Sequence, residues 1–510
     1  MRHAARFFFQ VPPFPGTRDR DIVTAPGRSP ASVDKNISVK SLVRALRDKR
    51  VGGEFWSDDD VWSDSSSRQV IRAKGDDPRL LLGAIAGRAL SSLSPGQFSV
   101  LEVEKPGSDA LETAIEELVE HHLLRGVNYV DPFNGSPISA IALIDVLGSW
   151  RRLIDTNRPI AAAFGFARWK RDTVAPLLWG GRAVPFRPAR ASELAALPKG
   201  ATVAVWKARV PSSFLQQLEA GPWQIMEVED GFIRSAGLGA DCVPPLSIVV
   251  DDLGVHYDRT RPSRLEEMLA RRDHRPEDLA RASHLREWII QSGISKYGVS
   301  SAVPAARIGG SRRHILVVGQ VEDDRSVLFG SGDVRSNLEL LKRVRAQAPD
   351  AWIIYRPHPD VEAGHRKGAI PIQVARGFAD QIEPATPIQG LISLADEVHV
   401  MTSLAGFEAL LQGKTVTTYG TPFFAGWGLT RDLAPVPVRR GTPLTLDELT
   451  STVLLRYPRY LDPVTNLPCT AETLVTRLLS GVQRQNRAIV PLRRLAGWAR
   501  RSVAQLAGTR

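Results

Sequence analysis

Two acidic clusters in the chain each follow a short run of β-forming residues. The runs are 225–228 and 315–318, and the carboxylates that follow them are Glu229, Asp230, Glu322, Asp323 and Asp324. Open α/β sheets form their ligand crevice at the carboxyl ends of strands, which is where this order would place both clusters. Transfer of a sugar with retention of configuration requires two such groups, a nucleophile and an acid/base. In isolation, each cluster is also typical of a solvated turn.

Two further segments carry side chains suited to a phosphate group. Arg356 and His358 follow a β-forming run, and prolines on both sides of the histidine restrict its movement, so that its ring and the guanidinium can hold an anion. Thr402 and Ser403 stand where a strand passes into a helix, whose free N–H groups would bind a nucleotide phosphate. Glu408, one turn later, can accept hydrogen bonds from ribose hydroxyls. As structure alone, the two segments are a rigid turn and a capped helix.

A divalent cation is the alternative use of the acidic residues. Asp251 and Asp252 follow another apolar run, and with Asp323 and Asp324 they offer the oxygen ligands that such ions bind. We favour a site without a metal or cofactor, because the phosphate-binding groups can stabilise a departing phosphate electrostatically.

A loop rich in aromatic residues and glycine occupies 419–430. Tyr419, Phe423, Phe424 and Trp427 are interleaved with glycines there. Such a loop can cover the face of a base or a sugar, or it can pack between domains. The sequence leaves both possibilities open.

The elements that would position these residues are two α/β domains with parallel sheets. From about residue 156, short β-rich runs alternate with helical stretches, which is typical of such sheets. The predicted strands are 160–166, 202–206, 225–228 and 246–250 in the first domain, and 315–318, 352–355, 397–401 and 415–419 in the second. The boundary is expected near 300–312, where serines and glycines interrupt the pattern.

An internal repeat lies outside these predicted sheets. Residues 117–132 align without gaps to 448–463, with eight of sixteen positions identical. We interpret 69–155 as the helical tail of a lost upstream module. Duplication of a small helical motif is the alternative. Residues 1–68 are rich in Pro, Arg, Ser and Asp and are predicted to be mostly irregular.

Composition indicates an acidic partner. The net charge is +11, which suits nucleic acid, anionic lipid or a nucleotide-sugar with a polyanionic product. No nucleic-acid-binding motif accompanies the charge. Residues 484–510 contain seven arginines and no acidic residue, with apolar residues at helical spacing, which predicts a basic amphipathic helix on an anionic membrane surface. A frayed or docked basic tail is the alternative.

Cellular location follows from cysteine usage and hydropathy. The chain has only two cysteines, Cys242 and Cys469, and no apolar stretch near the ~18 residues that span a bilayer. We therefore expect a cytoplasmic protein, peripheral at the inner membrane.

Several motifs, read in chain order, resemble one family. They are EDGFIRSAGLG (229–239), PPLSIVVDDLG (244–254), YDRTRPSRLE (257–266), QVEDD (320–324), RPHPD (356–360), TSLAGFEALL (402–411) and YGTPFFAGWGLT (419–430). Together they resemble the retaining β-Kdo transferases of bacterial capsular polysaccharide biosynthesis, where Kdo is 3-deoxy-D-manno-oct-2-ulosonic acid. The resemblance covers about 156–480. That family typically has two modules, and this chain shows one complete module.

The resemblance implies a fold, a reaction and roles for residues. The fold would be two Rossmann-like domains facing a cleft (GT-B type), an acceptor-side domain at 156–310 and a CMP-sugar-binding domain at 311–440, with a helical tail at 441–483. The donor would be CMP-β-Kdo and the acceptor a Kdo-terminated glycolipid. Asp324 would be the nucleophile and Glu229 the acid/base, with Asp230 beside it. His358, Ser403 and Glu408 would hold CMP.

Partners and alternatives complete the expectation. Other capsule synthesis and export proteins are expected partners, and nucleic acid is not. One alternative is a transferase for another CMP-activated acidic sugar, because the phosphate and cytidine contacts would be shared. The other is a non-catalytic capsule assembly or export protein, although the retained carboxylates argue against it.

Overall fold

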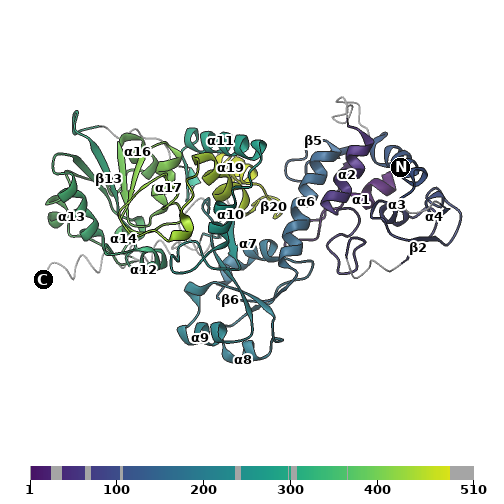
Figure 1. Ribbon diagram of the computed structural model, residues 1–510, viewed down its shortest axis with the longest axis horizontal. Helices are drawn as coiled ribbons and strands as arrows, with labels where there is room; N and C mark the ends of the chain where they lie inside the picture. The colour runs from purple at the N-terminus through teal and green to yellow at the C-terminus, as the bar shows by residue number, and fades with distance from the viewer. Residues whose placement is uncertain are drawn as a thin grey trace. The chain divides into compact units, whose positions relative to one another are not determined.

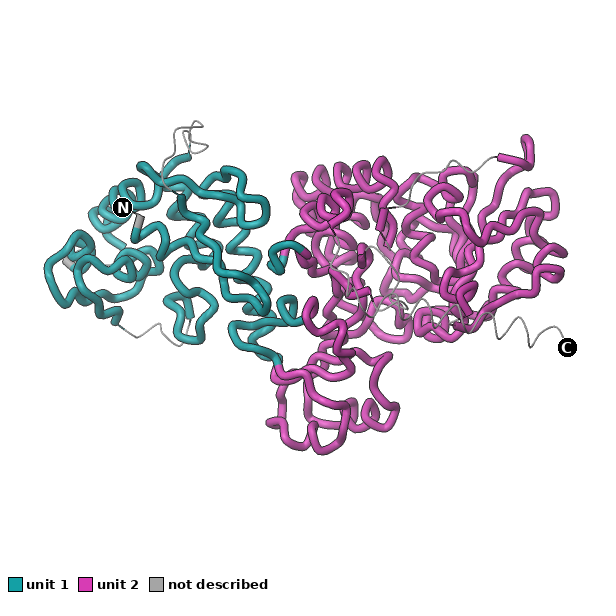
Figure 2. The backbone as a smooth tube through the Cα atoms, turned by 180° about the vertical axis from the view of Figure 1, so that it is seen from behind, with its two compact units in different colours: residues 1–160, 175–184, 464–468 teal, residues 161–174, 185–463, 469–510 magenta. Residues whose placement is uncertain are grey.

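The chain forms two compact units. The computed structural model describes residues 2–24, 37–63, 70–103, 107–235, 243–296, 298–299, 307–364 and 366–482. Unit 1 comprises residues 1–160, 175–184 and 464–468, and unit 2 comprises 161–174, 185–463 and 469–510 (Figure 2). Residues 300–306, which form part of the predicted domain boundary near 300–312, and residues 483–510, which include the predicted basic amphipathic helix, lie outside the described residues.

Unit 1 is mainly helical. Its helices are α1 (Arg2–Phe8), α2 (Val39–Lys49), α3 (Pro78–Ile85), α4 (Val100–Val103), α5 (Asp109–Val119) and α6 (Ala140–Asn157). One small sheet has the order β1-β4-β5, formed by Val23–Thr24, Asn128–Val130 and Pro137–Ile138. A second pairs β2 (Ile71–Ala73) with β3 (Leu90–Ser92) in parallel. Asp77 and Ser139 cap α3 and α6 by accepting main-chain N–H bonds.

Helices α1 and α2 fall in the segment that was predicted to be mostly irregular. Phe8 on α1, and Leu42 and Leu46 on α2, are completely buried. Residues 42, 43 and 46 form one apolar face of α2 that points inward. This apolar pattern is too short to be recognised as helical among the surrounding prolines and charged residues. The segment therefore contributes to a packed core that the sequence analysis missed.

Residues from distant parts of the chain pack into unit 1 and form hydrogen bonds there. The indole Nε1 of Trp150 donates to the main-chain oxygen of Pro468 at 2.7 Å, and Asn466 donates to Pro15 O at 2.6 Å. The ring of Phe14 packs edge-on against Trp179 with 4.9 Å between ring centroids. Residues 175–184 and 464–468 are thus integral parts of this unit.

The repeat found in the sequence is also a repeat of structure. In each copy a helix passes into a π-helical turn, two short strands and a second helix. The first copy is α5, Glu120–Leu124, β4, β5 and α6, and the second is α18 (Leu446–Thr450), Ser451–Arg456, β19 (Arg459–Leu461), β20 (Pro468–Cys469) and α19 (Ala471–Leu479). Equivalent buried tyrosines hold each turn: Tyr129 donates to Leu123 O at 2.5 Å, and Tyr460 donates to Leu454 O at 2.7 Å.

The first sheet of unit 2 is mixed. Its order is β20-β19-β10-β9-β8-β6-β7, and it includes β6 (Ile160–Phe164), β7 (Phe186–Arg187), β8 (Thr202–Val205), β9 (Gln224–Asp230) and β10 (Ser247–Asp251). β8 and β9 are parallel, but β10 runs antiparallel to both β9 and β19. The prediction of a parallel sheet was therefore wrong for this half, because a buried apolar run reads the same in either direction when both faces of a sheet are covered.

The second sheet of unit 2 is parallel throughout. Its order is β15-β14-β13-β16-β17-β18, made by Gln381–Ile382, Trp352–Arg356, His314–Val318, Glu397–Val400, Thr415–Thr418 and Arg431–Asp432. Helices α13 (Asn337–Gln347), α16 (Ile388–Leu394) and α17 (Leu404–Leu411) lie beside it (Figure 1). In chain order this is 3-2-1-4-5-6, the doubly wound arrangement that binds nucleotides where the strand order reverses. That point lies between β13 and β16.

All eight strands predicted from the sequence are present within two residues of their predicted ends. The remaining helices of unit 2 are α7 (Arg168–Leu178), α8 (Ala191–Ala195), α9 (Ser212–Ala220), α10 (Arg264–Arg271), α11 (Pro276–Gln291), α12 (Arg325–Gly330), α14 (Pro359–Glu362) and α15 (Ile372–Arg376). A hairpin joins β11 (Ile294–Ser295) to β12 (Gly298–Val299). Within the described residues, no helix is both long and apolar enough to cross a bilayer.

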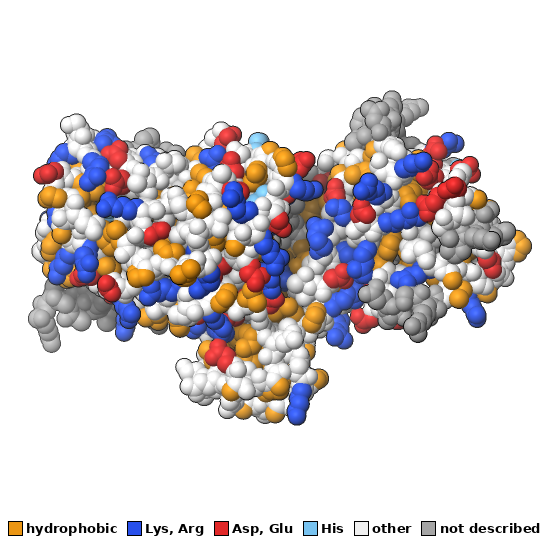
Figure 3. All heavy atoms as spheres, viewed as in Figure 1, with side chains coloured by type: hydrophobic (Ala, Val, Ile, Leu, Met, Phe, Trp, Pro, Cys, Tyr) orange, Lys and Arg blue, Asp and Glu red, His pale blue; other side chains and the backbone are white. Residues whose placement is uncertain are grey.

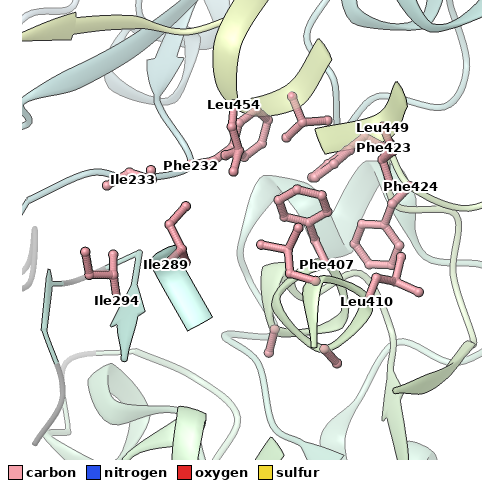
Figure 4. Close-up of a cluster of buried hydrophobic side chains, with 14 of the residues drawn as sticks. Phe232, Ile233, Ile289, Ile294, Phe407, Leu410, Phe423, Phe424, Leu449 and Leu454 are labelled. Atoms are coloured by element: carbon pink, nitrogen blue, oxygen red, sulfur yellow. The ribbon is translucent and has the colours of Figure 1, made fainter. Parts of the chain in front are cut away.

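The aromatic loop 419–430 belongs to the core of unit 2. Phe423 and Phe424 are buried with Phe407 of α17 and with Leu449 and Leu454 of the tail (Figure 4). Trp427 is also fully buried and donates to Phe423 O at 2.9 Å. Of the two roles that the sequence left open for these aromatic residues, the structure shows packing.

Charged side chains cover much of the surface. On the face drawn in Figure 3, Lys and Arg side chains lie among Asp and Glu on both units. Exposed ion pairs among the described residues include Arg343 with Glu339 and Arg307 with Asp396. Exposed pairs of this kind contribute little to stability, about 0–1 kcal/mol each.

Candidate active site

Glu229 lies at the carboxyl end of β9. It is half-buried, and its Oε1 accepts a hydrogen bond from the hydroxyl of Tyr257 at 2.9 Å. Burial, together with the negative charge of Asp230, raises the pKa of Glu229 to about 7. A carboxyl group with a pKa near neutrality can give or take a proton at physiological pH, which an acid/base catalyst must do.

Asp230, the next residue, is held in ion pairs. Its Oδ2 lies 2.9 Å from Arg234 Nε and its Oδ1 lies 3.4 Å from Lys170 Nζ. Burial alone would raise the pKa of Asp230, but Arg234 and Lys170 hold it well below the usual range. Asp230 is therefore a fixed negative charge that anchors two cations beside Glu229, and its geometry does not suit it to proton transfer.

Asp324 is the N-cap of α12. Its Oδ1 accepts from the main-chain N–H of Ser326 at 2.9 Å and from the hydroxyl of Ser326 at 2.7 Å. Among the residues that the structure describes, none donates a hydrogen bond to Oδ2. The charge of Asp324 acts on both Glu229 and His358, and the next residue, Arg325, bonds the tyrosine that donates to Glu229.

Arg325 connects the two carboxylate loops. Its Nε donates to the hydroxyl of Tyr257 at 3.1 Å, and the same hydroxyl donates to Glu229. The guanidinium also lies 4.8 Å from the ring centroid of Phe329 on α12. The acidic cluster 322–324 is therefore linked to β9 through one tyrosine.

His358 follows β14 and caps α14. Its Nδ1 accepts from the main-chain N–H of Asp360 at 3.1 Å, so the neutral ring carries its proton on Nε2. Burial lowers the pKa of His358, which favours this neutral form. His358 is thus arranged as a hydrogen-bond donor through Nε2.

Arg356 is committed to the main chain. Its side chain is buried, and it donates from Nε to Thr386 O at 3.0 Å and from Nη1 to Pro357 O at 2.7 Å. Burial also lowers its pKa. These bonds fix the turn that carries His358, so Arg356 supports the predicted phosphate site through that turn.

The ends of β13 and β16 are joined side by side. The amide of Gln320 donates to Thr402 Oγ1 at 3.0 Å, and the main-chain N–H of Thr402 donates to Gln320 Oε1 at 2.8 Å. Ser403 then caps α17, accepting from Ala405 N at 3.2 Å. Thr402 is therefore a structural link, while the first turn of α17 lies at the reversal point of the sheet.

Glu408 on α17 is tied to the β11–β12 hairpin. Its Oε1 accepts from the main-chain N–H of Lys296 at 2.9 Å, and burial raises its pKa to about 7. The positive charge of Lys296 acts on Glu408, Asp230 and His358. One lysine thus lies amid groups from both sheets.

The acidic residues considered for a divalent cation have other partners. Asp251 accepts from the main-chain N–H groups of Leu253, Gly254 and Arg264 and from the hydroxyl of Tyr457. Asp252 pairs with Arg264 at 2.7 Å, and Asp323 pairs with Arg366 at 3.2 Å. The described part of the chain contains no group of three acidic, His or Cys side chains arranged to hold a metal ion.

Family models place most of unit 2 in one known family. The family described as capsule polysaccharide biosynthesis protein matches residues 203–294 and 288–460, which together make up half of the chain. The chain belongs to this family. The matched residues include Glu229, Tyr257, Asp324 and His358.

Curated relatives of this capsule family protein come from two bacterial groups. It is 38% identical over 365 residues to the capsule polysaccharide modification protein LipA of Neisseria meningitidis serogroup B, which covers 71% of this chain and 51% of LipA. It is 36% identical over 314 residues to the lipopolysaccharide-processing protein LpsZ of Rhizobium meliloti, covering 60% of this chain and 70% of LpsZ. The chain therefore spans about half the length of LipA.

Two transferases are among the solved structures similar to the capsule family protein. The β-Kdo 2,7 transferase of Thermosulfurimonas dismutans KpsC matches with a TM-score of 0.50 and 35% identity, over 62% of this chain and 98% of that one. The β-Kdo 2,4 transferase of the same organism's KpsC matches with a TM-score of 0.54 and 29% identity, with the same coverage. The predicted resemblance to capsular Kdo transferases is thus confirmed.

Three basic or phenolic residues of the site were not singled out from the sequence. Lys170 lies 3.3 Å above the ring of Trp206, and burial lowers its pKa to about 8. Tyr257 and Lys296 complete the set. Lys170 lies on α7, shortly after the predicted strand that forms β6. Its position after the end of a strand is the signal that could have identified it. Tyr257 begins the motif 257–266, to which the sequence analysis gave no role in the site, and Lys296 lies in a hairpin without a motif.

Proposed function

We propose that this protein transfers Kdo from CMP-β-Kdo to a Kdo-terminated glycolipid in the synthesis of capsular polysaccharide, with retention of configuration. The two sheets of unit 2 would act as the two halves of a GT-B fold. The observation that supports this best is the hydrogen-bonded link from Glu229 at the end of β9, through Tyr257, to Arg325, the neighbour of Asp324, next to the reversal point of a doubly wound sheet. Similarity to two solved Kdo transferases supports the choice of sugar.

The donor phosphate would bind beside His358 and the start of α17. In the neutral histidine, Nε2–H is the remaining donor for a phosphate oxygen, because Nδ1 is used by Asp360. The N-terminal N–H groups of α17, which follows Ser403, add a second set of donors for an anion. CMP then leaves with its negative charge stabilised, and no metal is needed for this step.

Transfer would proceed in two displacements. Asp324 Oδ2 attacks the anomeric carbon of Kdo, the bond to the CMP phosphate breaks, and a glycosyl ester forms on Asp324. Glu229 then removes the proton of the acceptor hydroxyl, whose oxygen attacks the same carbon and releases Asp324. Two inversions give net retention. The pKa of Glu229 near 7 suits it to accept that proton.

A donor comparison tests the function directly. Purified protein would be incubated with a short Kdo-terminated acceptor and either CMP-Kdo, generated in situ, or CMP-sialic acid. We expect product only with CMP-Kdo, and NMR of the product to show a β linkage. Product from CMP-sialic acid alone would identify a transferase for another acidic sugar, and the absence of any product with either donor would favour the non-catalytic alternative.

Replacing His358 should weaken nucleotide binding. His358→Ala removes the Nε2 donor and also the cap of α14, whereas His358→Asn keeps a capping side chain. We expect CMP affinity to fall about tenfold or more in both variants, as for loss of a charge-assisted hydrogen bond. Titration calorimetry with CMP measures this, with thermal melting as the check on folding. Wild-type affinity in the His358→Asn protein would remove His358 from the site.

The membrane contact is proposed from the sequence of the basic segment 484–510. Its seven arginines and apolar stripe suit an anionic lipid surface. Deleting 484–510 should release the protein from vesicles containing anionic lipid in a flotation assay, while turnover on a soluble acceptor persists. Vesicle binding equal to that of the full chain would place the membrane contact elsewhere.

A further inference from the structure

Tyr257 is the side chain through which the two catalytic loops meet. Its hydroxyl donates to Glu229 at 2.9 Å and accepts from Arg325 at 3.1 Å. Glu229 ends β9 of the first sheet, and Arg325 follows Asp324 at the start of α12 beside the second sheet. The main chain of Tyr257 also lies against the other end of α12, because a Cβ added to Gly330 would come 3.3 Å from Tyr257 O.

We propose that Tyr257 is a positioning residue that fixes the acid/base Glu229 relative to the nucleophile Asp324 and favours the ionised form of Glu229. This inference rests on the proposed function and assigns a role to a residue that takes no part in bond making. Tyr257 lies against both ends of α12: its hydroxyl binds Arg325, and its main-chain oxygen lies beside Gly330. A shift of this side chain would therefore move both carboxylates relative to one another.

The direction of the hydrogen bonds follows from chemistry alone. An arginine Nε–H can only donate, so the oxygen of Tyr257 must accept from Arg325. Its single proton is then left for Glu229, which must accept it as a carboxylate oxygen. A hydrogen bond that is donated to a carboxylate stabilises its charged form.

Tyr257 works against other groups around Glu229. Burial and the charges of Asp230 on the same strand and Asp324 beside α12 favour protonation of Glu229, while Lys170 on α7 and the hydroxyl of Tyr257 oppose it. Burial also raises the pKa of Tyr257 far above its usual value, so the hydroxyl keeps its proton throughout the range of activity. Tyr257 is thus a constant donor, and Glu229 is the group that titrates.

Kinetics of a Tyr257→Phe protein test the effect on catalysis. Loss of the hydroxyl should raise the pKa of Glu229 further. The acid limb in the plot of kcat/KM for the acceptor against pH should therefore move up by about one pH unit. Transfer would fall about tenfold at pH 6 and recover toward wild-type rates at pH 9, with an unchanged dissociation constant for CMP. Arg325→Met should shift the limb in the same direction by less. Combined with Tyr257→Phe, it should add nothing further.

Thermal melting gives a readout that does not require transferase activity. A raised pKa of Glu229 means that folding favours its protonated form, so this stabilisation is present below about pH 4.5 and is lost as pH rises through about 7. In Tyr257→Phe the loss should continue to higher pH. We therefore expect the difference in melting temperature between wild type and Tyr257→Phe to grow from pH 6 to pH 9, and this growth to vanish in a Glu229→Gln background.

Tyr460→Phe is the matched control. Tyr460 is another buried phenol of unit 2, and its hydroxyl donates to Leu454 O at 2.7 Å in the tail. Its loss should lower the melting temperature equally at every pH and leave the pH–rate profile unchanged. A Tyr257→Phe protein that behaves in this way would show a structural role only and overturn the proposal. If wild type transfers no Kdo, the proposed function fails, while the melting experiment still decides whether Tyr257 acts on Glu229.

Discussion

Asp324→Asn should abolish Kdo transfer while the protein stays folded and still binds CMP. Asp324 caps α12 through Oδ1, and asparagine is an equally good cap, so the variant keeps the bond to Ser326. Asparagine cannot form the glycosyl ester, because the amide nitrogen or oxygen is a poor nucleophile compared with a carboxylate. We expect a loss of roughly 10⁴-fold or more in kcat, as for removal of a catalytic group that acts in a covalent step.

The Asp324→Ala variant is harder to interpret than Asp324→Asn, because the substitution changes two properties at once. It removes the nucleophile and the cap together, and losing an N-cap costs about 1 kcal/mol of stability. If both variants lose transfer but only Asp324→Ala melts lower, the loss belongs to chemistry. Ser336→Ala gives a matched control for the cap alone, because Ser336 caps α13 by accepting from Glu339 N at 3.2 Å and lies outside the proposed site.

Intact-protein mass spectrometry tests the covalent step itself. Wild-type protein that is given CMP-Kdo without acceptor should gain the mass of one Kdo residue, and peptide mapping should place it on Asp324. The Asp324→Asn protein should gain none. Appreciable transfer by Asp324→Asn, or an adduct on Asp323 or Asp230, would assign the nucleophile to another carboxylate and leave the fold and family standing.

Glu229→Gln should separate the two displacements. Glutamine keeps the size of the side chain and an oxygen that can accept from Tyr257, but it cannot take the acceptor proton. The first displacement would proceed and the second would stall, so the adduct on Asp324 should accumulate even with acceptor present. Turnover should fall about 10²–10⁴-fold, the usual contribution of a general base.

The pH dependence gives a second test of Glu229. In wild type the ionised carboxylate of Glu229 is the active base. The kcat/KM for the acceptor should therefore rise with pH through about 7 and then level off. The residual rate of Glu229→Gln should be flat over the same range. A wild-type acid limb near pH 4.5, or one that persists in Glu229→Gln, would mean that another group controls the reaction.

The sequence was a good guide to strands and a poor guide to their direction. Eight strands were located because each combines β-branched or aromatic residues with flanking turn signals. The antiparallel course of β10 was missed, since its buried run resembles that of a parallel strand. Helices α1 and α2 were missed because their apolar faces are only two or three side chains long.

Site residues differed in how far the sequence could assign them. The ends of the predicted strands carry Glu229, Asp324, His358 and the start of α17, where the sequence placed them, and their roles stay predictions. The sequence could not show that Arg356 and Thr402 are occupied by main-chain and side-chain partners, because those partners, Thr386 and Gln320, lie 30 and 82 residues away along the chain. Tyr257 begins the motif 257–266, but the motif gave it no role, and its contacts with Glu229 and Arg325 in three dimensions show where it acts.

The discontinuous make-up of unit 1 bears on how the protein is synthesised. Trp150 and Pro15 each bind a residue of the segment 464–468, at Pro468 and Asn466. At about 5–20 residues per second, a ribosome needs tens of seconds to advance from residue 160 to residue 468. Throughout that time the Trp150 indole and the Pro15 oxygen lack these partners. Unit 1 must therefore finish folding after residues 464–468 have been translated. Until then, chaperones are expected to bind it.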